Sequence, residues 1–195
     1  MKKLESSLKY MVIVLTAISL SAALLLAITN KVTEPTIEEI AQQNLENGIK
    51  AVLGVDAADS LSVTEETDST GEFTLYHTDL GTAIKTSSNG FGGPIEILVG
   101  FATDGTILGY QILSHAETPG LGAKAGEWFQ EGQKGCIIGL RPDSANLTVS
   151  KDGGDIDAIT ASTITSRAFL RGVQAAYDRL MPSTPDGTTG ATSQQ

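Results

Sequence analysis

The stretch Ile95–Leu113, which reads IEILVGFATDGTILGYQIL, indicates the fold class of this chain. Apolar residues alternate with other residues over Ile95–Phe101, and a second apolar segment returns over Ile107–Leu113. Between the two segments stands Asp104-Gly105, a dipeptide that is typical of the tight turn in a β-hairpin. We therefore expect two antiparallel strands joined at this turn.

Other segments carry weaker strand patterns. Phe73–His77 and Ala83–Ser87 are short strand-like segments with a turn between them, and both precede the hairpin; Leu147–Ser150 is a candidate for one more strand. Asp56–Gly71 is acidic and rich in Ser, Thr and Asp, which predicts a loop.

Helical patterns lie on both sides of the strands. Thr36 and Glu39 have the spacing of a capping box, which predicts the start of a helix. Gly54 predicts its end. Apolar residues share one helical face in each of two segments: Ile37, Ala41, Leu45, Ile49 and Val52 in the first, and Phe169, Val173, Ala176 and Leu180 in the second. The fold class predicted is α+β, with a single domain that contains an antiparallel sheet.

An apolar segment without any charged residue runs from Tyr10 to Asn30. A helix needs about 20 such residues to cross a bilayer. Three lysines precede the segment, and acidic residues outweigh the basic ones after it, so the positive-inside rule places the N-terminus in the cytoplasm. We expect a cytoplasmic segment (1–9), a single transmembrane helix (10–30), an extracytoplasmic domain (31–181) and a disordered tail (182–195).

A cleaved signal peptide is the alternative for the apolar segment. Its apolar core usually has about 7–15 residues and ends at a small-x-small site. The segment here is longer, although Ser19–Ala23 contains small residues with that spacing.

Composition excludes several kinds of site. The formal net charge is −10, and the 13 basic residues are scattered, which argues against nucleic acid as a partner. One cysteine and two histidines are too few for a thiolate metal centre, an iron–sulfur cluster or a multi-histidine site.

Two segments contain residues that suit ligand binding. HAETPGLGAK, from His115 to Lys124, has a proline and two glycines within four residues. The backbone N–H groups of this loop could approach a flat ring or a phosphate, or the segment could simply form a turn.

The second segment is TASTITS, from Thr160 to Ser166, which has five hydroxyl side chains where a helix begins. One N-cap accounts for one hydroxyl, whereas a phosphate would use several hydroxyls and the helix N–H groups. A Ser or Thr nucleophile needs a base held close to it. The one histidine near these loops is His115, and nothing in the sequence pairs it with a hydroxyl of the run, so no base is evident.

With these motifs the chain resembles a known family. TASTIT, from Thr160 to Thr165 and preceded by Asp157, resembles the flavinylation motif of the FMN-binding domain family, whose usual form is D-x-x-[ST]-G-A-[ST]-x-T. HAETPGLG matches that family's second loop. Together with one N-terminal membrane helix, the two motifs resemble the G subunits of the Rnf electron-transport complex.

The resemblance implies FMN attached by a phosphoester to Thr165. It also implies that a separate flavin transferase forms this bond from FAD, which fits the lack of an evident base. The isoalloxazine ring is expected against the second loop, and the phosphate at the helix N-terminus. The implied FMN contacts are Thr160, Ser162, Thr163, Ile164, Thr165 and Asp157 and, in the loop, His115, Glu117, Thr118, Pro119, Gly120, Leu121, Gly122 and Lys124.

One departure from the family motif concerns the backbone. Ala161-Ser162 stands where the family has Gly-Ala. If the family's glycine adopts a positive φ, Ala161 would be strained by about 1 kcal/mol.

The same resemblance implies a role and a location. The chain would relay electrons between ferredoxin and NAD in a complex coupled to ion translocation, as an electron-transfer subunit rather than a catalyst alone. It would be a single-pass protein of the bacterial inner (cytoplasmic) membrane, with membrane lipid, other membrane subunits and the transferase as partners. The alternatives are the C subunit of a sodium-pumping NADH:quinone oxidoreductase, an anchored domain that binds a non-redox ligand, and a purely structural subunit.

Overall fold

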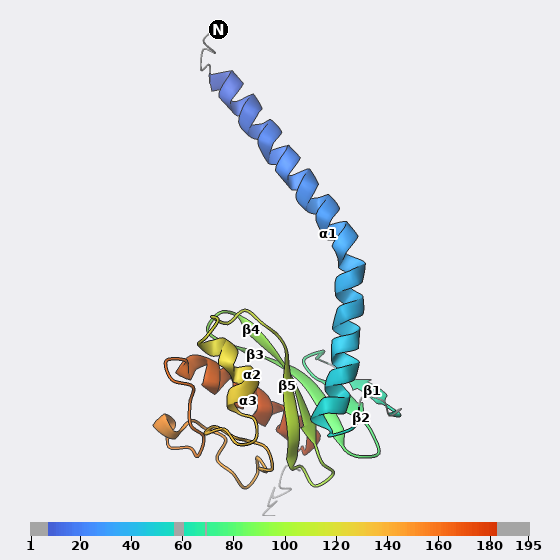
Figure 1. Ribbon diagram of the computed structural model, residues 1–195, viewed down its shortest axis with the longest axis vertical. Coiled ribbons are helices and arrows are strands. Elements are labelled where there is room, and N and C mark those ends of the chain that lie inside the picture. Colours follow the sequence, from blue (N-terminus) through green and yellow to red (C-terminus); the bar gives the residue numbers. More distant parts are fainter. Residues whose placement is uncertain (1–7, 57–60, 69, 183–195) are drawn as a thin grey trace, which may run out of the picture. The chain divides into compact units, whose positions relative to one another are not determined.

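The computed structural model describes residues 8–56, 61–68 and 70–182. The described residues divide into two units, one up to Asn44 and one from Leu45 onward. The helices and strands are α1 (Leu8–Val52), β1 (Thr64–Thr67), β2 (Thr74–His77), β3 (Thr82–Asn89), β4 (Pro94–Phe101), β5 (Ile107–His115), the 3-10 turn η1 (Gly122–Lys124), α2 (Ala125–Trp128), the 3-10 turn η2 (Ser150–Asp152) and α3 (Thr163–Leu180) (Figure 1).

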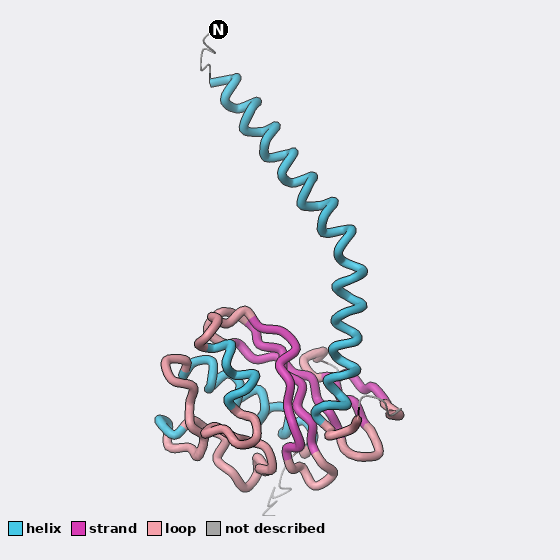
Figure 2. Tube along the Cα trace, in the orientation of Figure 1, coloured by secondary structure: helices cyan, strands magenta, loops and turns pink. Residues whose placement is uncertain are grey.

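The strands, which are magenta in Figure 2, form one sheet. Neighbouring strands are antiparallel, and their order follows the sequence, β1-β2-β3-β4-β5. The predicted hairpin is confirmed as β4 and β5. At its turn the Ala102 N–H donates to the Thr106 carbonyl at 2.8 Å, and the Asp104 carboxylate accepts from the Thr106 N–H at 2.9 Å. Gly105 has φ +84°, the conformation for which this turn needs glycine.

The first unit of the described chain is the part of α1 up to Asn44. The helix is long and apolar enough to cross a membrane, since an 18-residue window has a mean hydropathy of 2.7 and is 0% buried. The prediction of a new helix at Thr36 is wrong, because α1 runs through this position with Pro35 inside it. Proline removes one backbone hydrogen bond, but the residues on both sides favour a helix and the ladder resumes.

The last turns of α1 pack on one face of the sheet. Ile49, Val52 and Leu53 form a buried cluster with residues of β2, β3 and β4. Gly100 of β4 and Gly109 of β5 are paired, and a Cβ on Gly100 would overlap the Val52 carbonyl oxygen. The two glycines therefore let the helix end approach the strand backbones.

The predicted end of this helix at Gly54 is confirmed. The Gly54 N–H bonds to the Ala51 carbonyl (3.3 Å) and the Val55 N–H to the Lys50 carbonyl (2.9 Å), the two bonds of a Schellman motif. Gly54 has the positive φ, +70°, that this motif requires.

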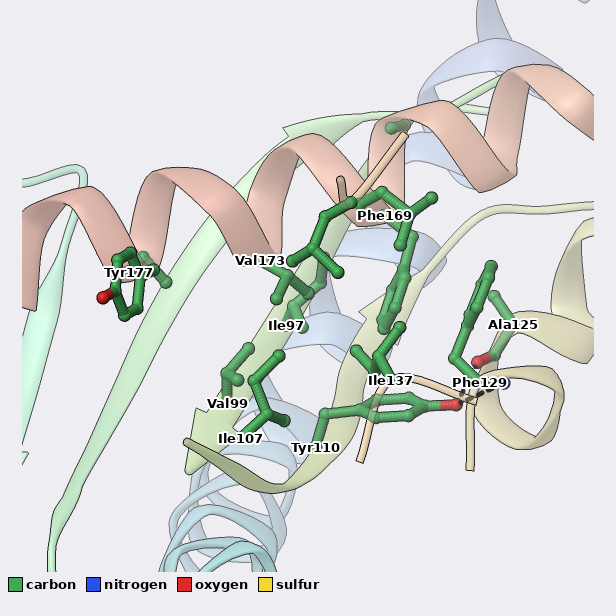
Figure 3. Packing of buried hydrophobic residues seen from close by; sticks show 14 of the residues in the cluster. Ile97, Val99, Ile107, Tyr110, Ala125, Phe129, Ile137, Phe169, Val173 and Tyr177 are labelled. Carbon is green, nitrogen blue, oxygen red and sulfur yellow. Dashed lines mark hydrogen bonds between the residues drawn. The ribbon is translucent and has the colours of Figure 1, made fainter. Parts of the chain in front are cut away.

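The main core lies on the opposite face of the sheet, under α3. Phe169 and Val173 of α3 point toward Ile97 of β4 and Tyr110 of β5 (Figure 3). Phe169 stacks on Phe129 with ring centroids 4.4 Å apart, and it makes an edge-to-face contact with Tyr110 with ring centroids 4.7 Å apart. This packing fixes α3 on the sheet and places its N-terminus near the loop that follows β5.

Two strand predictions are wrong. The segment predicted as a loop contains β1, whose residues Thr64–Thr67 are all exposed, so burial produces no alternating pattern in the sequence. Leu147–Ser150 forms no strand, because Val149 makes only an isolated bridge to Ile156. The predicted tail lies outside the described residues from residue 183 onward.

Candidate functional site

The centre of the site is a hydrogen bond between the two motifs. The Thr165 hydroxyl donates to Glu117 Oε2 at 2.7 Å, although the residues are 48 positions apart. Thr165 is 1% exposed and Glu117 is 6% exposed. The pairing therefore brings a carboxylate to a threonine for which no base was evident from sequence.

Backbone donors hold the other oxygen of Glu117. Oε1 accepts from the N–H groups of Phe91 (2.7 Å) and Gly92 (3.0 Å), in the turn between β3 and β4. A Cβ on Gly90 would overlap Oε1, and one on Gly122 would overlap Oε2. Sequence reasoning missed the Phe91-Gly92 turn; its glycine-rich sequence FGGP was the available signal.

These contacts set the charge of Glu117. Burial raises the pKa of this carboxyl, but hydrogen bonds from the Thr165 hydroxyl and from the N–H groups of Gly92 and Phe91 lower it. The net result is a pKa below the ordinary value of a glutamate. Glu117 is therefore a carboxylate at neutral pH, and its Oε2 acts as an acceptor toward Thr165.

Thr165 stands in the first turn of α3, which begins at Thr163. The first helical bond of α3 runs from the Ser166 N–H to the Ser162 carbonyl at 3.0 Å. The N–H groups of Thr163, Ile164 and Thr165 thus precede the bonded ladder, and they provide the positive end of the helix dipole.

The two serines of the run differ in their side-chain contacts. The Ser166 hydroxyl donates to the Ser162 carbonyl and accepts from the Ile159 N–H, both at 3.0 Å. Ser162 is the N-cap residue, but its side chain makes no capping hydrogen bond.

Ala161 adopts a left-handed backbone, with φ +62°. It is the only non-glycine residue with a positive φ in the described part of the chain. Ala161 stands where the family motif has glycine, and its positive φ means that the predicted strain, about 1 kcal/mol, is present.

A pocket with a volume of about 410 Å³ opens beside the pair. Three apolar side chains at the pocket remain exposed, Phe91 (70%), Ile164 (51%) and Leu121 (42%). Its lining comprises Phe91, Glu117, Thr118, Leu121, Gly122, Ala161, Ser162, Thr163, Ile164 and Thr165. Apolar side chains beside first-turn N–H groups suit a flat ring that carries a phosphate.

The remaining predicted residues lie outside this lining. The His115 ring accepts from the Glu117 N–H at 3.2 Å, and the Asp157 carboxylate accepts from the Ser150 hydroxyl at 3.2 Å. The predicted residues that do not line the pocket are His115, Pro119, Gly120, Lys124, Asp157 and Thr160. A larger depression of about 620 Å³, lined by residues of β2, β3, β4 and α3, contains neither motif.

Comparison with known proteins identifies a family whose model spans the residues of the pocket. The model of the FMN-binding domain family matches residues 90–178. The G subunit of the ion-translocating oxidoreductase complex of Methanosarcina acetivorans is 32% identical over 177 residues, which cover 86% of this chain and 91% of that protein. The G subunit of the proton-translocating ferredoxin:NAD(+) oxidoreductase complex of Clostridium ljungdahlii is 40% identical over 100 residues, 50% of this chain and 51% of that one.

The extent of these matches differs. The chain spans about half the length of several curated relatives that it matches. A solved structure of the C subunit of Na(+)-translocating NADH-quinone reductase from Parabacteroides distasonis has a TM-score of 0.46 and 16% identity, over 76% of this chain and 98% of that chain. The match to the Methanosarcina protein is long enough to assign the family, and the chain belongs to the G subunits of ion-translocating oxidoreductase complexes.

Proposed function

We propose that this chain is a membrane-anchored flavoprotein subunit that relays electrons through FMN attached by a phosphoester to Thr165. Membership of the G-subunit family and the match to the FMN-binding domain support FMN as the cofactor. The choice of Thr165 as the attachment site is supported by one observation. Its buried hydroxyl donates a hydrogen bond to Glu117, and both residues line the pocket.

The residues of the pocket fit the two parts of FMN. The first-turn N–H groups of α3 suit the phosphate, because they are donors at the positive end of an 18-residue helix. Phe91, Leu121 and Ile164 offer apolar surface to a flavin ring. When bound, FMN supplies the electron transfer, and the chain supplies its position and surroundings.

The partners and the location follow as parts of the same proposal. The complex is an Rnf-type ferredoxin:NAD oxidoreductase coupled to ion translocation, in which other membrane subunits pass electrons to and from this chain. Support comes from the name of the Clostridium relative and from the apolar helix α1. A flavin transferase attaches the cofactor, and α1 anchors the chain once in the lipid of the bacterial cytoplasmic membrane.

The test is covalent flavin fluorescence. The full-length chain is produced with a flavin transferase, denatured and separated on a gel, with Thr165→Val and, at an exposed threonine outside the pocket, Thr148→Val as matched variants. We expect a fluorescent band for the wild type and for Thr148→Val, and none for Thr165→Val. A dark wild-type band beside a fluorescent control substrate of the transferase would instead favour a domain without covalent flavin.

A further inference from the structure

We propose that Glu117 is the general base for flavin attachment, and that it takes the proton of the Thr165 hydroxyl as Oγ1 attacks phosphorus. This inference rests on the proposed function, because it concerns how Thr165 receives its FMN. It assigns a part of the attachment chemistry to the acceptor protein and not only to the transferase.

The hydrogen bond between Thr165 and Glu117 already places a proton donor and a proton acceptor in contact. Thr165 Oγ1 is the donor and Glu117 Oε2 the acceptor, 2.7 Å apart, within the reach that general base catalysis requires. The backbone of Phe91 and Gly92 fixes the other oxygen of the carboxylate. Oε2 is therefore directed at Thr165 before any partner arrives.

The same contact distinguishes Thr165 from its neighbours. Among the described side chains from Thr160 to Ser166, it is the only hydroxyl that donates to a carboxylate. The Ser166 hydroxyl donates to the Ser162 carbonyl, which cannot act as a base. The hydroxyl that contacts the carboxylate therefore belongs to Thr165, the residue that the family motif predicts to be modified.

The chemical step balances with a flavin dinucleotide as donor. A bond forms between Thr165 Oγ1 and the phosphorus on the FMN side of the anhydride. The bond from that phosphorus to the bridging oxygen breaks, and AMP leaves with the electron pair. The hydroxyl proton passes to Glu117 Oε2, and nothing is oxidised or reduced. Protein kinases use a carboxylate in the same way, to accept the proton of a substrate hydroxyl.

A purely structural role for Glu117 is the competing explanation. The side chain ties α3 to the loop after β5 and to the turn before β4. Loss of that tie would lower stability, but it would leave the rate of flavin attachment per folded molecule unchanged. Both explanations therefore predict a less stable Glu117 variant. Only the general-base explanation predicts slower flavin attachment per folded molecule.

The experiment measures single-turnover flavin attachment. The full-length chain is purified in detergent without flavin and mixed with excess flavin transferase and FAD, and intact mass is followed with time. Each rate is divided by the folded fraction, which is read from the fluorescence of Trp128, the one tryptophan. Glu117→Gln keeps the shape of the side chain and removes the base. Glu131→Gln makes the same charge change at an exposed residue and is the matched control.

We expect Glu117→Gln to be slower by a factor of about 100 or more, the usual contribution of a general base. Glu131→Gln should react within a factor of about two of the wild type, because exposed substitutions away from a site have small effects. Glu117→Asp, which retains a carboxylate, should recover part of the rate, and it provides the comparison if the glutamine variant does not fold. The ratio of the wild-type rate to the Glu117→Gln rate should stay constant through neutral pH. It should decrease toward one only in acid, where the carboxylate is protonated.

Equal rates per folded molecule for the wild type and Glu117→Gln would overturn the assignment of Glu117 and leave the proposed function intact. A wild-type chain that gains no mass, while a control substrate does, would instead remove the proposed function. The two failures are therefore distinguishable in one experiment.

Discussion

At the scale of single residues, the site depends on one buried carboxylate whose charge is maintained by hydrogen bonds. Glu117 has a lower pKa in the folded chain than its ordinary value. As pH falls, the unfolded chain takes up the proton first. The stability that this group contributes is thus complete above its unfolded pKa and is lost as pH falls through the folded pKa.

The consequence is a pH-dependent effect of Glu117→Gln. At neutral pH we predict that the variant lowers the free energy of unfolding by about 1–3 kcal/mol, since it weakens hydrogen bonds to a buried charge. The difference from the wild type should shrink as pH falls into the acid range. Urea unfolding followed by Trp128 fluorescence at a series of pH values measures this, and a difference that does not depend on pH would contradict it.

Ala161 gives a second prediction at this scale. Ala161→Gly relieves left-handed strain of about 1 kcal/mol, and it increases the entropy of the unfolded chain at a cost of about 0.4–1 kcal/mol. We predict a change between zero and a small gain in unfolding free energy. The matched change Ala175→Gly, inside α3, should destabilise by about 1 kcal/mol. Equal losses for the two variants in urea unfolding would show that Ala161 is not strained.

Residue-scale features were only partly predictable from the sequence. The strain at Ala161 was anticipated, because the family motif has glycine there and φ is a local property. The Glu117–Thr165 contact was not, because it joins residues 48 positions apart and exists only once α3 has packed on the sheet. The motifs predicted that both residues contact the cofactor, but they offered no reason to pair the two.

At the scale of elements, the close approach of α1 to the sheet depends on glycine. A methyl group on Gly100 would overlap the Val52 carbonyl. We predict that Gly100→Ala lowers the free energy of unfolding by about 1–3 kcal/mol, as overpacking usually does. Gly126→Ala is the control, because a Cβ there meets nothing within 4 Å. A Gly100→Ala chain as stable as the control in urea would contradict this packing.

Patterns were reliable for elements that bury several of their apolar residues. The β4–β5 hairpin and α3 were predicted, since their apolar residues face the core. β1 was missed because both faces of this edge strand are exposed. The short helix α2 was also missed, since four residues are too few to show a helical period.

At the scale of the whole molecule, the proposed function gives the chain one orientation in the membrane. The lysines at the N-terminus and the acidic residues after the apolar segment predict a cytoplasmic N-terminus. Alkaline phosphatase fused after Met181 should therefore be active in cells, and green fluorescent protein fused at the same position should be dark. The reverse pattern would place the domain in the cytoplasm and remove the proposed orientation.

The central claim is that one threonine of a hydroxyl-rich run carries the flavin. The most direct measurement is fragmentation mass spectrometry of the tryptic peptide 152–167 from the full-length chain produced with a flavin transferase. We predict that the mass of one FMN less one water is found on Thr165, the residue that donates to Glu117. The same added mass on Thr160, Ser162, Thr163 or Ser166, or an unmodified peptide from a preparation in which a control substrate is modified, would contradict the account.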